Sequence, residues 1–290
     1  MTRIVVCDEK RRVKRNPALA VHQVRKIVGV DFSAARDAGR HIWICSARMA
    51  ATGLRVEFVK PAENLPGGGR ERADATMALR RYLAGADHVV AGLDFPFSLP
   101  RAVVGQADYR AFLLQFGARF QSAEAFRASC FQAGQGREPK RMTDIVARAP
   151  FAPSNLRMFR QTFFGIRDVL APLVESGSAR VVPMMRPARG ATTLIEICPA
   201  VFLKRARLYS PYKGSGSGPC SSREVVLDYF TERRSLLSLP PSVREIIIHD
   251  AGGDALDSVL AALATREALI EGRVAQAPPG DVRRIEGEIL

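Results

Sequence analysis

The sequence is poor in cysteine and has no long apolar run. Its five cysteines among 290 residues are scattered, and no two form a Cys-x-x-Cys pair, so neither a disulfide framework nor a thiolate zinc site is indicated. No stretch approaches the roughly 20 apolar residues that a membrane span needs. Residues 1–16 (MTRIVVCDEKRRVKRN) carry charge where a secretory signal peptide would be apolar. We therefore expect a cytoplasmic protein that does not enter a membrane.

Glycine-rich phosphate loops are also absent. The glycines at 29, 92 and 67–69 form neither G-x-G-x-x-G nor G-x-x-x-x-G-K-[ST], which disfavours a kinase site built on such a loop. No repeat at a solenoid or propeller period is visible. With 47% hydrophobic residues, the chain is long enough for one domain whose core needs neither disulfide nor structural metal.

Positive charge is in excess and is unevenly distributed. The chain has 43 Lys and Arg against 29 Asp and Glu, a formal charge of +14. Residues 1–26 hold eight basic and two acidic side chains, and residues 100–190 hold fourteen and six, so these two segments account for the whole excess. Such segregation indicates a polyanion partner, most simply nucleic acid. The alternative is a genome that favours arginine everywhere.

The order of apolar segments predicts a mixed α/β fold. Three short runs joined by turns read as an antiparallel meander, and a helix, a buried strand, a basic helical section, a further strand and a last helix follow. In order, the segments are 26–35, 41–50, 54–62, 71–86, 88–100, about 100–185, 191–200 and 250–270. This order is that of the ribonuclease H-like fold, a three-layer α/β domain.

We therefore predict a mixed five-stranded sheet in the order 3-2-1-4-5. The predicted domain covers residues 27–290, with a helical insertion at about 100–185, and follows a basic N-terminal arm at 1–26. The stretch KGSGSGP at 213–219 has the composition of a flexible linker.

Several carboxylates occupy costly positions. Asp31, Asp94 and Glu196 lie at or inside apolar strands, where an unpaired carboxylate costs several kcal/mol. Asp257 lies in the apolar last helix, and Asp254, three residues earlier, shares its face. The first and fourth strands are neighbours in the predicted sheet and the last helix crosses their ends, so these side chains could converge. Such oxygen clusters hold Mg²⁺ or Mn²⁺.

Each carboxylate also has a structural interpretation. Asp254 or Asp257 could cap the last helix, Asp94 could cap a turn, and Glu196 could face a lysine. Two metal ions held by these groups would activate a water and stabilise the leaving oxygen of a phosphodiester.

Four motifs carry a family resemblance: GVDFSAA (29–35), GLDFPFSLP (92–100), EICPA (196–200) and DALDSVLAALA (254–264). They resemble the motif series of the domain of unknown function 429 family, predicted nucleases of ribonuclease H-like fold. DALDSVLAALA is also similar to the last helix of the Holliday junction resolvases. The resemblance implies that Asp31 and Asp94 are strand ligands and that Asp257 and Asp254 are helix ligands of the metal. Glu196 has no fixed counterpart and would be an extra ligand or a positioning group.

The basic insertion offers candidate phosphate contacts at Lys140, Arg141, Arg157 and Arg160; a solvated helix face is the alternative. The aromatic residues 159, 163 and 164 have helical spacing, which favours core packing over base stacking. His249 is either a general base or a structural histidine.

The sequence predicts a metal-dependent nuclease with Mg²⁺ or Mn²⁺ as cofactor, nucleic acid as partner, and Asp31, Asp94, Glu196 and Asp257 as catalytic residues. A nucleic-acid-binding module without catalysis remains open. So does a phosphotransferase or nucleotide hydrolase of the actin-like group, although the chain lacks that group's phosphate turn. Resolvase-like activity would predict a homodimer.

Overall fold

The computed structural model describes residues 19–84, 88–105 and 108–290. Most of the predicted basic arm, residues 1–18, lies outside the described residues. Within the described ranges, no helix is long and apolar enough to cross a membrane.

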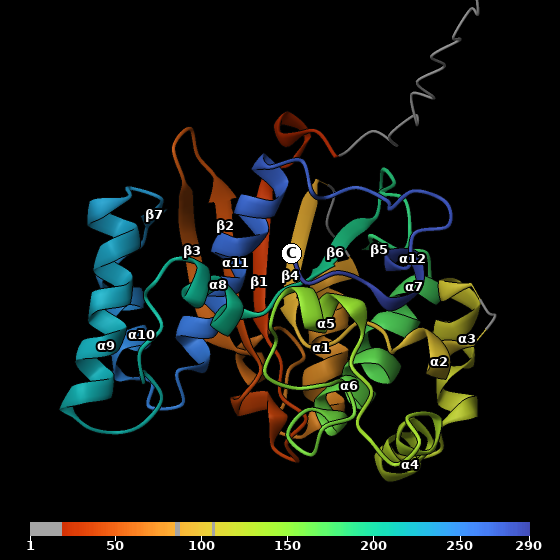
Figure 1. Cartoon of the computed structure of the whole chain (residues 1–290). Coiled ribbons are helices and arrows are strands. Elements are labelled where there is room, and N and C mark those ends of the chain that lie inside the picture. Colours follow the sequence, from red (N-terminus) through yellow and green to blue (C-terminus); the bar gives the residue numbers. More distant parts are fainter. Residues whose placement is uncertain (1–18, 85–87, 106–107) are drawn as a thin grey trace, which may run out of the picture.

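A mixed sheet forms the centre of the molecule (Figure 1). In the described residues it has seven strands in the order β5-β6-β4-β1-β2-β3-β7. Strand β2 pairs antiparallel with β1 and β3, and the other neighbours are parallel. The strands are β1 (Lys26–Asp31), β2 (Trp43–Met49), β3 (Leu54–Pro61), β4 (Val89–Asp94), β5 (Ala179–Val182), β6 (Thr192–Glu196) and β7 (Leu237–Ser238).

The prediction of five strands in the order 3-2-1-4-5 is wrong. Strands β5 and β7 add an edge on each side, and β3, β2, β1, β4 and β6 lie between them. Both edge strands are short, with four and two residues. Segments that short carry too few alternating positions to be distinguished from loops by periodicity.

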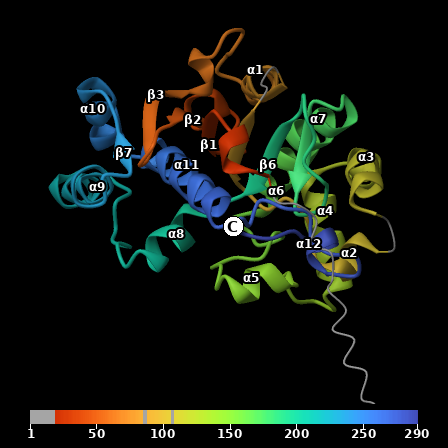
Figure 2. The same ribbon diagram turned by 90° about the horizontal axis from the view of Figure 1, so that it is seen from above.

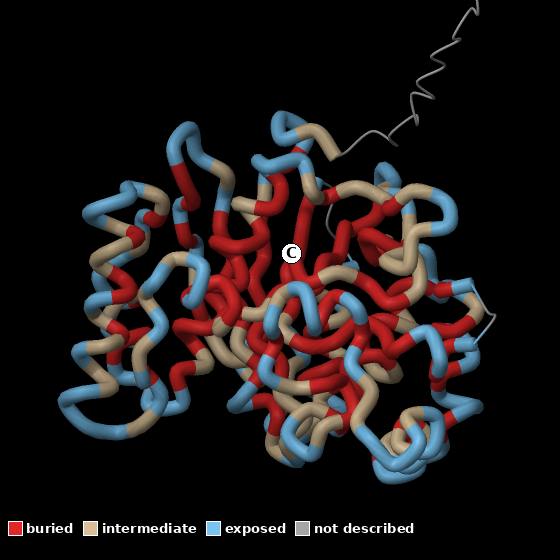
Figure 3. The backbone as a smooth tube through the Cα atoms, in the orientation of Figure 1, coloured by how far each residue is buried: buried red, intermediate tan, exposed pale blue. Residues whose placement is uncertain are grey.

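Helices cover both faces of the sheet. Viewed from above, α1 (Arg72–Ala84) lies on one side and α11 (Asp254–Ile270) on the other (Figure 2). Each face of the sheet has its own apolar core. Side chains of α1 belong to one core, and side chains of α11 belong to the other. Strands β1, β4 and β6, which lie between them, are almost completely buried (Figure 3). The domain is therefore a three-layer α/β structure.

Between β4 and β5 the chain is helical. The helices there are α2 (Arg101–Val104), α3 (Tyr109–Arg119), α4 (Ala123–Ala133), α5 (Met142–Val146), α6 (Phe159–Gly165) and α7 (Ala171–Glu175). After β6 come α8 (Pro199–Arg205), α9 (Ser217–Asp228), α10 (Pro241–His249), α11 and α12 (Arg283–Glu286). Phe159 and Phe163 are buried in the core under this section, which confirms the packing interpretation of these aromatic residues.

Candidate active site

Two aspartates end neighbouring strands at the same level. Strands β1 and β4 are parallel, and Asp31 is directly opposite Asp94 in their register. Neighbouring strands lie about 4.8 Å apart. Two residues earlier, Gly29 is likewise opposite Gly92. Because side chains two residues apart share a face of the sheet, both carboxylates lie on the face that α11 covers.

The paired glycines bring α11 close to this face. A Cβ atom on Gly29 would lie 2.0 Å from the carbonyl oxygen of Ser258, and one on Gly92 would lie 2.0 Å from Oγ1 of Thr265. Real atoms cannot approach so closely, so only glycine permits this packing. The repeated Gly-x-Asp of GVD and GLD thus serves both the helix contact and the placement of the two aspartates.

The first turn of α11 presents two more carboxylates. Its N-terminal amides are partly satisfied by Asp250, whose Oδ2 accepts a hydrogen bond from Ala255 N at 2.8 Å. Neither Asp254 nor Asp257 acts as the cap, so their side chains are available to the sheet edge. A helix N-terminus also stabilises negative charge in its first turn.

These four aspartates line one pocket of about 730 Å³. Asp31 and Asp257 are 7% and 3% exposed, whereas Asp94 and Asp254 are partly open to the pocket. The four aspartates that the sequence predicts to converge, Asp31, Asp94, Asp254 and Asp257, therefore line the same pocket.

A lysine that the sequence did not single out lies among these carboxylates. Lys213 Nζ is 2.7 Å from Asp257 Oδ2 and 3.6 Å from Asp254 Oδ1. The hydroxyl of Tyr212 donates to Asp257 Oδ1 at 2.7 Å. Arg223 fixes this segment by donating to the carbonyl oxygens of Tyr212 and Gly214.

The linker interpretation of residues 213–219 is therefore wrong in two respects. Lys213 is anchored in the pocket, and α9 already begins at Ser217. Glycine and serine content predicts flexibility only where no tertiary contact holds the chain, and the contacts here come from distant residues.

The four aspartates of the pocket have raised pKa values. For Asp31 the main cause is burial, followed by repulsion from Asp257 and Asp254, with Lys213 opposing the rise. Burial, followed by Asp257, also raises the pKa of Asp94. Burial would lower the pKa of Lys213, but attraction to Asp257 and Asp31 outweighs it and the pKa rises. The pocket therefore concentrates negative charge beyond what one lysine neutralises.

Asp31→Asn is expected to stabilise the protein in the presence of a chelator. A carboxyl group whose pKa is raised by folding contributes stability below its unfolded pKa, near the ordinary value of 3.8, and loses it as the pH rises through the folded pKa. Asparagine has no such loss. Thermal melts should show a higher Tm for the variant around neutral pH, with a difference that shrinks as the pH approaches the ordinary value.

Asp228→Asn is the matched control, because Asp228 is partly exposed and pairs with Arg244 at 2.7 Å. It should change Tm little at any pH. A Tm of Asp31→Asn below that of the wild type around neutral pH would contradict the electrostatic account.

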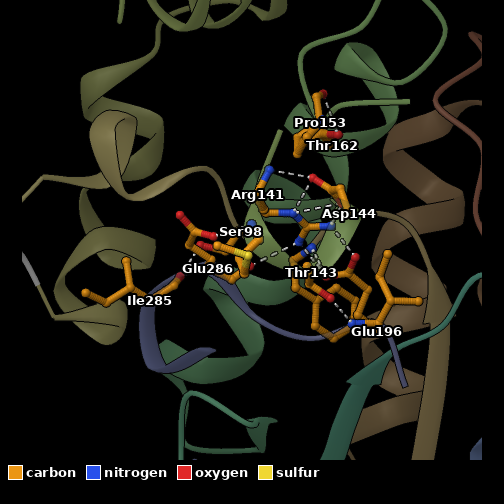
Figure 4. A network of polar contacts seen from close by, with 12 residues as sticks. Ser98, Arg141, Thr143, Asp144, Pro153, Thr162, Glu196, Ile285 and Glu286 are labelled. Atoms are coloured by element: carbon orange, nitrogen blue, oxygen red, sulfur yellow. Dashed lines mark hydrogen bonds and ion pairs between the residues drawn. The ribbon is translucent and has the colours of Figure 1, made fainter. Parts of the chain in front are cut away.

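Glu196 also lines this pocket, but its hydrogen bonds belong to a different network. It ends β6, but its neighbour Ile195 packs on the α11 side, so alternation turns Glu196 to the opposite face. Its Oε1 and Oε2 accept from Arg141 at 2.6 and 2.8 Å, and Oε2 also accepts from Phe97 N. Arg141 also pairs with Asp144 at 2.7 Å (Figure 4).

Two sequence predictions change with this network. Arg141 is 0% exposed, so its prediction as a phosphate contact is wrong. Both carboxylate oxygens of Glu196 accept hydrogen bonds from Arg141. The sequence had suggested a lysine as the structural partner of Glu196, and the partner is this arginine. Its geometry is that of a positioning group, one that fixes the end of β6 against α5.

The other predicted basic contacts lie on the surface. Arg157 and Arg160 are exposed and line the pocket, and Arg160 pairs with Glu124 at 2.8 Å. Lys140 is exposed but donates to the carbonyl oxygen of Ala149. His249 is exposed and lies outside the pocket lining, bonded to the carbonyl of Glu245.

The donor chemistry of the pocket fits a hard divalent cation. Carboxylate oxygens from β1, β4 and α11 meet there with raised pKa values, and such oxygens are the preferred ligands of Mg²⁺. As placed, however, no three His, Cys, Asp or Glu side chains in the described part of the chain are grouped closely enough to hold one ion. The aspartate side chains would therefore have to move closer together when a metal ion binds.

Comparison with known proteins does not assign this chain to a family. No protein-family model matches the chain, and neither a curated protein nor a solved structure matches it.

Proposed function

We propose that this chain is a metal-dependent nuclease of the ribonuclease H-like fold that hydrolyses phosphodiester bonds of nucleic acid. One observation carries the proposal: Asp31 and Asp94 lie in register on parallel strands, in one pocket with Asp254 and Asp257 of the covering helix. An acidic cluster of this composition, at the carboxyl ends of strands, is suited to binding metal ions and a phosphate between them.

The positions of three of the four motifs support the family resemblance. GVDFSAA spans the end of β1, GLDFPFSLP the end of β4, and DALDSVLAALA the start of α11. All three therefore meet at one edge of the sheet. A three-layer domain in which an antiparallel meander leads into parallel strands is the architecture that the resemblance implies.

Asp31, Asp94, Asp254 and Asp257 would hold Mg²⁺ or Mn²⁺, which when bound supplies an activated water and charge stabilisation for the leaving oxygen. Lys213 and Tyr212 favour the ionised form of Asp257. Gln161 of α6 donates to the carbonyl oxygens of Phe32 and Asp94 and so ties the ends of β1 and β4 together.

Positive side chains around the pocket favour a polyanionic substrate. Arg157, Arg160, Lys204 and Lys213 all line it. Arg157 has no carboxylate partner within the described residues and lies 5.3 Å from the ring centre of Phe151. Phosphate contacts from such groups position a strand without reading its sequence.

The test is cleavage of a panel of labelled DNA and RNA, single-stranded, duplex and branched, with Mg²⁺, Mn²⁺ or chelator. We expect metal-dependent cutting by the wild type and its loss in Asp31→Asn and Asp257→Asn. Asp228→Asn, which alters a partly exposed ion pair away from the pocket, should cut normally. Binding without cutting under every metal would favour the alternative of a non-catalytic binding module.

A further inference from the structure

A second cavity, away from the carboxylates, is lined by arginines. It has a volume of about 680 Å³ and lies between the start of α2, the first turn of α3, the end of β5 and α12. Four separate chain segments contribute its five arginines, Arg101, Arg110, Arg180, Arg186 and Arg284. In Figure 1 these elements lie at the side of the sheet opposite to α9.

The two acids in the lining do not neutralise these arginines. Asp281 is paired with Arg283, at 2.7 Å, which lowers the pKa of its carboxyl group. Asp108 caps α3 by accepting from Ala111 N at 3.0 Å. In the part of the chain that the structure describes, four of the five guanidinium groups have no hydrogen bond or ion pair: Arg101, Arg110, Arg186 and Arg284.

Unpaired like charges in one hollow repel each other and do not stabilise the fold. They do form a receptor for oxyanions, because guanidinium groups bind phosphate oxygens through paired, charge-assisted hydrogen bonds. Arg284 is partly buried, which strengthens such bonds relative to those on an open surface, and Arg186 is exposed and so accessible to a ligand. Four of the five arginines belong to the basic segment 100–190.

The arginine cavity has a fixed relation to the carboxylate pocket. Arg101 follows Asp94 by seven residues, which limits their separation to about 25 Å, or about seven steps of a nucleic acid at 3.4 Å per step. Glu286 joins the two regions by accepting from Arg101 N at 2.8 Å and from Met142 N at 2.6 Å. Arg141 donates to the carbonyl oxygen of Glu286 at 3.2 Å and also binds Glu196.

We infer that the arginine cavity binds backbone phosphates of the same nucleic acid strand that enters the carboxylate pocket, several nucleotides from the reacting bond. The inference rests on the proposed function. It implies that affinity rises once a strand is long enough to reach both sites.

The test measures binding by the full chain in chelator, so that cutting plays no part. The probes are fluorescent single strands of about 20 and about 4 nucleotides, of which only the longer spans both sites at 3.4 Å per step. The variant is Arg186→Gln with Arg284→Gln. The matched control is Arg233→Gln with Arg234→Gln, two exposed arginines that follow α9.

We expect the double variant to bind the long strand about tenfold or more weakly, with a salt slope smaller by about 1.4 for two lost phosphate contacts. The advantage of the long strand over the short one should largely disappear. The control pair should keep that advantage. Arg110→Gln, at an exposed position, should weaken long-strand binding in the same direction and guards against misfolding of the double variant.

Equal long-strand affinity of wild type and double variant would overturn the inference, even if the wild type cuts nucleic acid. Tripolyphosphate and a mononucleotide are tested in parallel. If these lose binding in the double variant while the long strand does not, the cavity serves a small phosphate ligand and the inference is wrong. Arginine-dependent binding of the long strand without cutting under any metal would instead contradict the proposed nuclease and leave the cavity assignment standing.

Discussion

Arg141→Met is expected to lower the free energy of unfolding by about 3–5 kcal/mol, the usual cost of removing one partner from a buried ion pair. Arg141 is completely buried, and its guanidinium group binds Glu196 and Asp144, which are themselves 3% and 1% exposed. Methionine would fill similar space but leave both carboxylates without a counter-charge. Denaturant unfolding followed by circular dichroism measures the change.

Arg160→Met is the matched control. Arg160 forms an ion pair of similar length with Glu124, at 2.8 Å, but the two side chains are 58% and 64% exposed. Solvent screens such a pair, so its loss should cost less than about 1 kcal/mol. Combining Arg141→Met with Glu196→Leu should recover part of the loss, because one stranded charge disappears. Equal effects of the two arginine substitutions would contradict the role assigned to burial.

The contrast between these two arginines shows where prediction from the sequence stops. Both lie in a polar, basic stretch with the composition of an exposed surface. Arg160 is on the surface, whereas Arg141 is buried because its partner Glu196 lies 55 residues away in the chain. Local composition carries no information about such a partner. For the same reason the role of Lys213, in a glycine- and serine-rich stretch, could not be predicted from the sequence.

The aspartates were predictable because local patterns place them. An apolar, β-branched run that ends in a polar residue predicts a strand with that residue at its end, and this applies to Asp31 and Asp94. Asp254 and Asp257 follow from helical periodicity. Alternation along β6 could have separated Glu196 from this group, since Glu196 faces away from α11, but only once the register of β6 against β4 is known.

Gly29→Ala is expected to destabilise the protein by at least about 3 kcal/mol, at the upper end of the usual cost of overpacking. The added Cβ would lie 2.0 Å from Ser258 O and 2.4 Å from Ala262 N, both backbone atoms of α11. A side chain could rotate away, but these atoms move only with the helix. Removing the clash therefore requires α11 to shift by about 1 Å.

Gly117→Ala is the control for alanine itself. Gly117 lies in α3, and a Cβ there would meet only Arg167 side-chain atoms, the nearest at 3.6 Å. Since alanine is the better helix former, this substitution should stabilise the protein by about 0.5–1 kcal/mol. If Gly29→Ala were as harmless, the close approach of α11 to β1 could not be the reason for glycine at this position.

The same shift links stability to the proposed activity. Ser258 follows Asp257 directly, so a helix displaced from Gly29 also displaces Asp257 from Asp31. A misplacement of about 1 Å in a catalytic group can cost about 100-fold in rate. Folded Gly29→Ala, assayed below its Tm, should therefore cut about 100-fold more slowly while binding nucleic acid normally in chelator. A variant that is destabilised but cuts at the wild-type rate would show that the position of α11 does not control the chemistry.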